Sequence, residues 1–235
     1  MMTSKKILGV YHIGCIGRYL HIVRKQLEML YTSGLYNRMK KLIIFISNYN
    51  ENDSRLKTIL ELYDPKRKFV LQVSKDNLME KFAINEFRKY IQDESYVFYF
   101  HSKGVSHSSK EMNYHNWRKI LDHYTIKQWE LNLKLLLKNH AVGCFLTKYP
   151  TYHFSGNFWW ARTEYVMKLP PKCGDAYLSP EMWIGTNYDS DTFVSFTNDE
   201  KYNYKYHREI NNKNKILQNI TKEVLENKKA KNYQY

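Results

Sequence analysis

The sequence predicts an α/β domain with a mostly parallel central sheet flanked by helices, and three observations support this class. Short apolar runs that suit strands alternate with amphipathic helical patterns. Several runs are apolar throughout, which is typical of strands buried on both faces of a parallel sheet. The chain has 235 residues, of which 43% are hydrophobic, and this is enough for one core. We therefore expect one Rossmann-like domain over residues 1–235, with a helical tail from about residue 211.

The first part of the chain alternates strand and helix, and each strand is short and apolar. Helical spacing of leucine and valine follows the first strand, and Gly34 supplies a stop. The expected elements, in order, are a strand at 7–13, a helix through 20–30, a strand at 41–47, a short helix through 56–60, a strand at 69–73 and a helix over 79–91. Right-handed crossovers between such strands give parallel pairing.

The second part begins with the most apolar strand and becomes irregular toward its end. We expect a strand at 96–100, a long helix from about 115 to 139, a strand at 141–146, an aromatic strand within 153–170, a helix start at 179–181 and an edge strand at 193–196. Gly156 interrupts the aromatic strand, and glycine inside a strand often marks the close approach of a ligand or of another backbone.

The stretch SYVFYFHSKG, residues 95–104, is the segment around which the domain is organised. His101, Ser102 and Lys103 follow the buried strand, and Gly104 allows a tight turn behind them. Ligands of open α/β sheets collect at the carboxyl ends of the strands. We expect these side chains, with His12 at the end of the first strand, to meet an anionic ligand. A solvated loop after a strand is the plain alternative for residues 101–104, and a histidine packed inside the protein is the alternative for His12.

Composition limits the class of protein. No apolar run reaches the roughly 20 residues of a membrane span, and the N-terminus lacks the pattern of a signal peptide. The three cysteines, Cys15, Cys144 and Cys173, are scattered and odd in number. This favours reduced thiols and a cytoplasmic location over a disulfide framework.

The formal net charge of +14 favours an anionic partner, such as nucleic acid, a membrane surface or phosphorylated small molecules. The basic residues are spread along the chain, and they form no compact stripe of the kind that binds nucleic acid. We therefore expect no nucleic-acid partner. A composition shaped by an AT-rich genome explains the excess of lysine equally well.

Three motifs in order point to a known family: HSKG at 101–104, GNFWWA at 156–161 and E-x-W-I-G at 181–185. With them, the chain resembles glycosyltransferases of the GT-A type, in particular bacterial and large-virus polysaccharide glycosyltransferases. The resemblance spans roughly residues 7–185. It implies transfer of a sugar from a nucleotide-sugar donor to a hydroxyl of a glycan or lipid-linked acceptor, in polysaccharide biosynthesis. Peripheral contact with an anionic membrane is compatible with the basic surface.

The resemblance assigns Glu181 the role of catalytic base. Inverting members of the fold place an acidic residue at a helix start, where it takes the proton of the acceptor hydroxyl. A carboxylate at a helix N-terminus also stabilises the helix without any catalytic role, and this structural alternative stays open.

The resemblance also raises the question of a metal. Most GT-A enzymes hold Mn²⁺ or Mg²⁺ with Asp-x-Asp after the organising strand, whereas this chain has His101-Ser102-Lys103 there. Lys103 supplies a fixed positive charge for the phosphates, and His101 can hydrogen-bond them or bind a metal. Metal ligands therefore stay unknown. The literal Asp-Ser-Asp at 189–191 lies outside the expected strand end and is interpreted as a surface feature, and His207 is interpreted as a surface histidine.

Aromatic residues form the second distinctive feature. Trp159, Trp160 and Trp183 offer flat faces that stack on sugar rings, while Asn157 can recognise hydroxyl groups beside Gly156. Adjacent strand residues point to opposite faces, so only one of Trp159 and Trp160 can face a ligand. The alternative is that all three tryptophans belong to the core.

Two other functions compete with sugar transfer. The first is a catalytically silent sugar-binding relative, consistent with the missing Asp-x-Asp. The second is a basic nucleic-acid-binding protein, supported by the charge and the aromatic content. The sequence leaves open the donor, the acceptor, the linkage and the oligomeric state.

Overall fold

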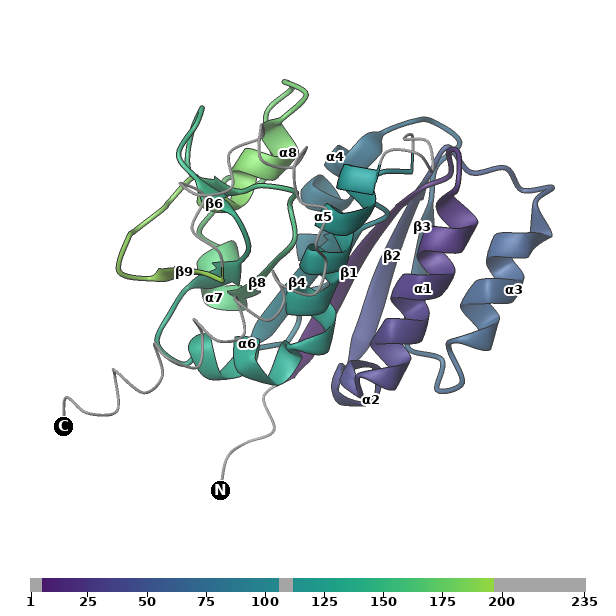
Figure 1. Ribbon diagram of the computed structural model, residues 1–235, viewed down its shortest axis with the longest axis horizontal. Helices are drawn as coiled ribbons and strands as arrows, with labels where there is room; N and C mark the ends of the chain where they lie inside the picture. The colour runs from purple at the N-terminus through teal and green to yellow at the C-terminus, as the bar shows by residue number, and fades with distance from the viewer. Residues whose placement is uncertain (1–5, 106–111, 197–235) are drawn as a thin grey trace.

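A computed structural model describes residues 6–105 and 112–196, and Figure 1 shows its layers. A seven-stranded sheet runs through the molecule in the order β3-β2-β1-β4-β8-β5-β9, and β6 and β7 form a second, two-stranded sheet. The four strands β3, β2, β1 and β4 are parallel to one another. β8 is antiparallel to both of its neighbours, and β5 pairs with β9 in parallel. The predicted class, an α/β domain with a mostly parallel central sheet flanked by helices, is confirmed.

The first half follows the predicted order closely. Its elements are β1 (Ile7–Gly14), α1 (Tyr19–Thr32), α2 (Leu35–Arg38), β2 (Lys41–Ser47), α3 (Ser54–Leu62), β3 (Phe69–Val73), α4 (Met79–Glu86), the 3₁₀ turn η1 (Phe87–Tyr90) and β4 (Tyr96–His101). β1, β2 and β4 are buried along nearly their whole length, as their unbroken apolar sequences predict. Gly34 follows α1 with a φ of 82°, a conformation that glycine adopts without strain.

The predicted long helix is divided into three pieces: α5 (Met112–Asp122), the π-helical turn η2 (His123–Lys127) and α6 (Trp129–Leu135). Side-chain donors bind carbonyls of the π turn. Trp160 Nε1 donates to the Thr125 carbonyl at 2.7 Å, and Asn132 Nδ2 donates to the Tyr124 carbonyl at 2.6 Å. These bonds satisfy carbonyl groups at the point where the regular α-helical pattern is interrupted.

The predicted aromatic strand is also divided, because a turn separates its two parts. The elements here are β5 (Ala141–Gly143), β6 (Leu146–Thr147), β7 (His153–Phe154), β8 (Trp159–Arg162) and α7 (Thr163–Val166). Gly156 and Asn157 have φ values of 96° and 53° and form the turn between β7 and β8. The expectation of a glycine inside a strand was therefore wrong. The predicted strand at 141–146 is likewise broken at Phe145, whose φ is 54°.

The last described elements are α8 (Ser179–Met182), the 3₁₀ turn η3 (Trp183–Gly185) and β9 (Phe193–Ser195). β9 lies at the edge of the sheet, as predicted. α8 begins at Ser179, within the predicted helix start at 179–181, and its N-cap is Leu178. The expected tail from residue 211 lies outside the described residues.

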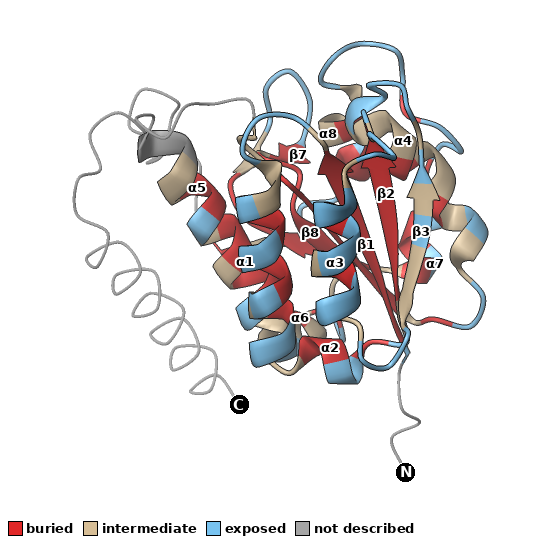
Figure 2. Cartoon of the chain, turned by 90° about the vertical axis from the view of Figure 1, so that its right-hand side faces the viewer, coloured by how far each residue is buried: buried red, intermediate tan, exposed pale blue. Residues whose placement is uncertain are grey.

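Helices cover both faces of the sheet, and side chains divide between two cores by strand alternation. On one face Tyr11, Phe98 and Trp160 pack with residues of α1, α5 and α6, and on the other Val10, Tyr99 and Trp159 pack with residues of α4 and α7. Figure 2 shows the central strands buried and the outer side of α1 and α3 exposed. In the part of the chain that the structure describes, no helix is both long and apolar enough to cross a bilayer.

Candidate active site

Polar side chains gather at the carboxyl edge of the parallel strands. His12 of β1 and His101 of β4 are partners in the strand register, and both are buried. Both belong to the face that packs on α4, because Val10 and Tyr99, two residues earlier on each strand, pack there. The parallel register thus brings these two residues together at one edge of the sheet, and their contact with an anionic ligand stays a prediction.

Lys103 lies in the turn that follows β4. Its amide donates to the His101 carbonyl at 2.8 Å, and Gly104 has a φ of 79°, which favours glycine. The Lys103 ammonium lies 4.2 Å from the ring centroid of Trp117. Arg118, a buried residue of α5, donates to the Lys103 carbonyl at 3.0 Å. A cation is thereby held at the edge of the sheet by an aromatic face and a fixed backbone.

Gly156 joins the edge to the segment that contains Glu181. Its carbonyl lies 3.0 Å from His101 Nε2, and its amide donates to Glu181 Oε1. A Cβ atom at this position would lie 2.7 Å from Leu121 Cδ1 and 3.4 Å from Lys103 Cε. Both the positive φ and the crowding require glycine here. The two polar groups of one residue therefore place His101 and Glu181 on either side of it.

Glu181 lies in the first turn of α8, and its side chain is half-buried. Pro180 stands at the start of this helix, where a missing N–H costs no hydrogen bond. The second carboxylate oxygen, Oε2, accepts no hydrogen bond from the described residues. Glu181 therefore keeps one oxygen available for a proton.

Glu80 belongs to the same cluster, although sequence reasoning missed it. Its Oε1 lies 3.1 Å from His101 Nδ1, and its Oε2 accepts a hydrogen bond from Asn157 Nδ2 at 2.6 Å. In the sequence Glu80 is one more acidic residue in the first turn of a helix, which helix stability alone explains. Glu80 meets His101 only because α4 packs on the sheet, and no sequence motif around Glu80 indicates this contact.

Asn157, Ser102 and His12 use their polar atoms inside the protein. The Asn157 amide binds Glu80 and accepts from Trp159 Nε1 at 2.9 Å, so the expectation that it recognises sugar hydroxyls was wrong for this structure. Ser102 Oγ accepts from the Gly14 amide at 3.0 Å, which ties β4 to β1. His12 Nε2 lies 2.9 Å from Ser47 Oγ, and burial is the main cause that lowers the pKa of His12 to about 3.

The three tryptophans expected to stack on sugar are core residues. Trp159 and Trp160 are 0% exposed and Trp183 is 2% exposed. Trp159 and Trp160 lie in the cores on opposite faces of the sheet, as strand alternation requires. Each indole N–H donates inside the protein, so packing and hydrogen bonding both explain why these large side chains are here. The expected aromatic wall is therefore corrected to a buried aromatic layer.

A second buried polar network lies beneath the end of β4. Gln26 Nε2 donates to the His101 carbonyl at 3.0 Å and to Asp122 Oδ1 at 2.7 Å, while its Oε1 accepts from Tyr11 at 2.7 Å. Burial raises the pKa of Asp122 to about 7, against the smaller opposing effects of the Gln26 hydrogen bond and the Arg118 charge. These contacts fix the backbone of β4 at the residue where the site begins.

The side chains at the edge do not suit a divalent cation. Among the described residues no group of three His, Cys, Asp or Glu side chains could hold a metal ion. Both ring nitrogens of His101 and both oxygens of Glu80 already have partners, and Lys103 adds a positive charge beside them. The Asp189-Ser190-Asp191 sequence is an exposed turn before β9, and His207 lies outside the described residues. The edge as built therefore fits an anion better than Mn²⁺ or Mg²⁺.

Residues 13–176, well over half of the chain, match the model of a protein family described as Domain of unknown function (DUF8361). The chain belongs to this family. No protein with curated function matches the chain significantly in sequence.

Similar solved structures share the architecture at low sequence identity. A mycobacterial protein is 12% identical with a TM-score of 0.51, and the match covers 83% of this chain and 65% of that one. A mannosyltransferase from Pyrobaculum calidifontis in complex with GDP-Man and Mn²⁺ is 10% identical with a TM-score of 0.49, covering 83% and 55%. Glucosyl-3-phosphoglycerate synthase from Mycobacterium tuberculosis, in complex with Mn²⁺, UDP and phosphoglyceric acid, is 12% identical with a TM-score of 0.49, covering 83% and 68%. The DUF8361 chain thus spans about half to two thirds of these proteins.

Proposed function

We propose that this DUF8361 protein is an inverting glycosyltransferase that transfers a sugar from a nucleotide-sugar donor to an acceptor hydroxyl. One observation carries the proposal. Around Gly156 the structure gathers the Glu181 carboxylate, bound to its amide, and the Lys103 side chain, whose Cε lies 3.4 Å from the position that a Cβ would take. A base and a cation at one sheet edge are what this transfer requires.

In this proposal Glu181 acts as the general base. The acceptor oxygen attacks the anomeric carbon of the donor sugar while its proton passes to the open Oε2 of Glu181. The bond between that carbon and the diphosphate oxygen breaks, and the diphosphate leaves with the electron pair. A single displacement of this kind inverts the configuration at the carbon.

Lys103 neutralises the departing diphosphate in the same proposal. Its ammonium is restrained over Trp117, so binding an anion costs little side-chain entropy. Arg118 holds the Lys103 carbonyl, which keeps the turn in place. The formal net charge of +14 further favours a polyanionic donor.

The acceptor in this proposal is a glycan or a lipid-linked sugar, used in polysaccharide synthesis. The basic composition supports binding near an anionic membrane surface, where such acceptors are found. Association with vesicles that contain anionic lipid, weakened by added salt, is the expected result. Salt-insensitive association, or none, would remove the membrane from the proposal.

A ligand screen followed by a turnover assay tests the function. Nucleoside diphosphates and their sugars are expected to raise the melting temperature, because a ligand that binds only the folded state stabilises it. Release of nucleoside diphosphate from one donor, increased by an acceptor glycan, then establishes transfer. Binding without any turnover across the donors and acceptors would indicate a silent sugar-binding protein, and tight binding of oligonucleotides alone would indicate a nucleic-acid partner.

A further inference from the structure

The His101 ring lies between two oxygen atoms. Nδ1 is 3.1 Å from Glu80 Oε1, and Nε2 is 3.0 Å from the Gly156 carbonyl oxygen. A carbonyl oxygen and an ionised carboxylate accept hydrogen bonds and cannot donate them. A neutral imidazole has a single N–H, so it can satisfy only one of these contacts. Both contacts become hydrogen bonds only when the pair of Glu80 and His101 holds a second proton.

The neighbours of Glu80 show where that proton lies. The Trp159 indole only donates, so the atom it contacts at 2.9 Å is Asn157 Oδ1. The Asn157 amide nitrogen must then face Glu80 Oε2, at 2.6 Å, and that oxygen accepts. A proton on Glu80 would therefore be on Oε1, directed toward His101. Whichever atom carries it, the second proton lies between Oε1 and Nδ1.

Burial favours the two-proton state of this pair. The titratable groups that face His101 are Glu80 from α4, His12 from β1, Lys103 after β4 and Glu181 from α8. Burial, followed by the Lys103 ammonium, lowers the pKa of His101 to about 3, against the Gly156 carbonyl and Glu181. A lone imidazolium is thus disfavoured. The pair with two protons has no net charge, whereas with one proton it carries a net negative charge between the His101 side chain, 8% exposed, and the Glu80 side chain, 24% exposed, and this partial burial penalises the charge.

We propose that the Glu80–His101 pair holds two protons at neutral pH and that Glu80 is a positioning residue of the glycosyltransferase. The pair anchors the Gly156 carbonyl through His101 Nε2, and the Gly156 amide anchors the Glu181 carboxylate. A chain of contacts thus runs from α4 to the base. The positioning role rests on the proposed function, whereas the proton count does not.

The variant Glu80→Gln tests the proton count. The glutamine amide oxygen can accept from Asn157 Nδ2, and its amide nitrogen can donate to His101 Nδ1. Both contacts of residue 80 are therefore kept, while the titratable proton of the Glu80 carboxyl is removed. His101 ring resonances of the full chain are followed by NMR against pH, and the variant His101→Gln assigns them. In the wild type the titration midpoint is expected above about pH 7. In Glu80→Gln it is expected below about pH 6, because burial lowers the pKa of a histidine that has no carboxylate partner. A wild-type midpoint below about pH 6 would overturn the proposal.

Kinetics test the positioning role, with Glu86→Gln as the control on the same helix. Glu80→Gln is expected to lower kcat about tenfold to a hundredfold, the scale on which small misplacements act. The KM for the donor stays within a few-fold, and the alkaline limb of the pH profile moves. An unchanged kcat and pH profile would overturn this role. If no donor is turned over while the NMR midpoint lies above about pH 7, the proposed function and the positioning role fail but the proton count stands.

Discussion

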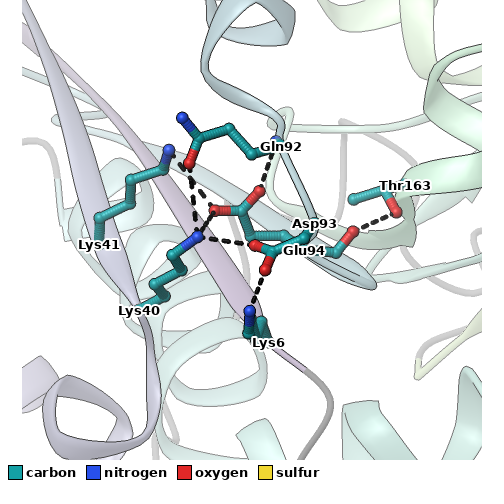
Figure 3. A network of polar contacts seen from close by, with 7 residues as sticks. All are labelled: Lys6, Lys40, Lys41, Gln92, Asp93, Glu94 and Thr163. Atoms are coloured by element: carbon teal, nitrogen blue, oxygen red, sulfur yellow. Dashed lines mark hydrogen bonds and ion pairs between the residues drawn. The ribbon is translucent and has the colours of Figure 1, made fainter.

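The two ends of the parallel sheet both carry charged and polar side chains, and they use them differently. At the amino end, Glu94 is fully buried on its side chain and lies 3.4 Å from the Lys40 ammonium and 3.5 Å from that of Lys41. Asp93 pairs with Lys6 and Lys40. Figure 3 shows these residues close together. The Gln92 backbone N–H donates to the Glu94 carboxylate, and the Thr163 hydroxyl donates to the Glu94 backbone carbonyl. Every carboxylate in this group has a lysine partner.

At the carboxyl end the polar groups are joined by hydrogen bonds, and the Lys103 ammonium lies over the ring of Trp117. Among the described residues no carboxylate lies within ion-pair distance of Lys103, and Glu181 keeps one oxygen without a hydrogen bond. His12 Nδ1 is buried, and none of the residues that the structure describes forms a hydrogen bond with it. The amino end thus pairs its charges within the protein, whereas the proposed function assigns the Lys103 charge at the carboxyl end to a ligand. The predictions below test this division.

The largest expected effect is on turnover in Glu181→Gln. The amide keeps an oxygen for the Gly156 amide but cannot take a proton, so kcat is expected to fall about 10²- to 10⁴-fold, the usual contribution of a general base. The melting temperature stays near that of the wild type. Unchanged turnover would remove Glu181 from the chemistry, and Glu164→Gln, on the surface of α7, is the matched control.

Gly156→Ala is expected to reduce both turnover and stability. A Cβ would lie 2.7 Å from Leu121 Cδ1 in a backbone with φ of 96°. Gly34→Ala is the control, because Gly34 has a φ of 82° and nothing within 4 Å of the added atom. It carries the strain of a positive φ, about 1 kcal/mol or more, without the crowding. Equal losses of unfolding free energy in urea, with equal activity, would show that Gly156 does not place the site.

Lys103→Gln is expected to weaken nucleoside diphosphate binding about tenfold to a hundredfold. This corresponds to ~1.5–3 kcal/mol for a hydrogen bond to a charged group. The same substitution at Lys40, at the amino end, is expected to leave binding unchanged while reducing stability slightly. Titration calorimetry on both variants measures the difference. Equal weakening by both would mean that net charge, and not the edge, attracts the ligand.

The smallest effect on activity is expected at Glu94. Burial raises the pKa of this carboxyl, but the hydrogen bonds from the backbone at Gln92 and Glu94 and the charges of Lys41 and Lys40 outweigh it, so the pKa lies below its usual range. Glu94→Gln is expected to cost about 1–3 kcal/mol of unfolding free energy at pH 7, with turnover per folded molecule unchanged.

The pH dependence of this cost follows from the direction of the shift. A lowered pKa in the folded state stabilises the protein fully above the usual glutamate pKa of about 4.3 and progressively less as pH falls through the folded value. The difference in urea stability between wild type and Glu94→Gln should therefore shrink below about pH 4. Asp93→Asn, whose partners are exposed, should change stability by about 0–1 kcal/mol. A constant difference from pH 7 to pH 3 would contradict this account of Glu94.

Burial on both faces made the central strands predictable. The apolar runs that became β1, β2 and β4 leave no alternative to a parallel sheet, and the carboxyl edge with His101 and Lys103 follows from their direction. The resemblance carried by the three motifs indicated that Glu181 lies near this edge. Its contact with the Gly156 amide was not foreseen.

Other features depend on contacts that one sequence does not contain. Glu80 lies 21 residues before His101, and only the packing of α4 on the sheet brings it near. The tryptophans could not be divided between core and ligand face, because an aromatic residue suits either place. The turn at Gly156 looked like a strand, because bulky aromatic residues flank it on both sides.

The position of a bound nucleoside diphosphate tests the central claim most directly. A crystal structure of the protein with that ligand is expected to place the diphosphate at the carboxyl end of β4, within hydrogen-bond distance of Lys103 and on the same side as Glu181. A diphosphate bound instead among Lys6, Lys40 and Lys41 at the amino end would contradict the account.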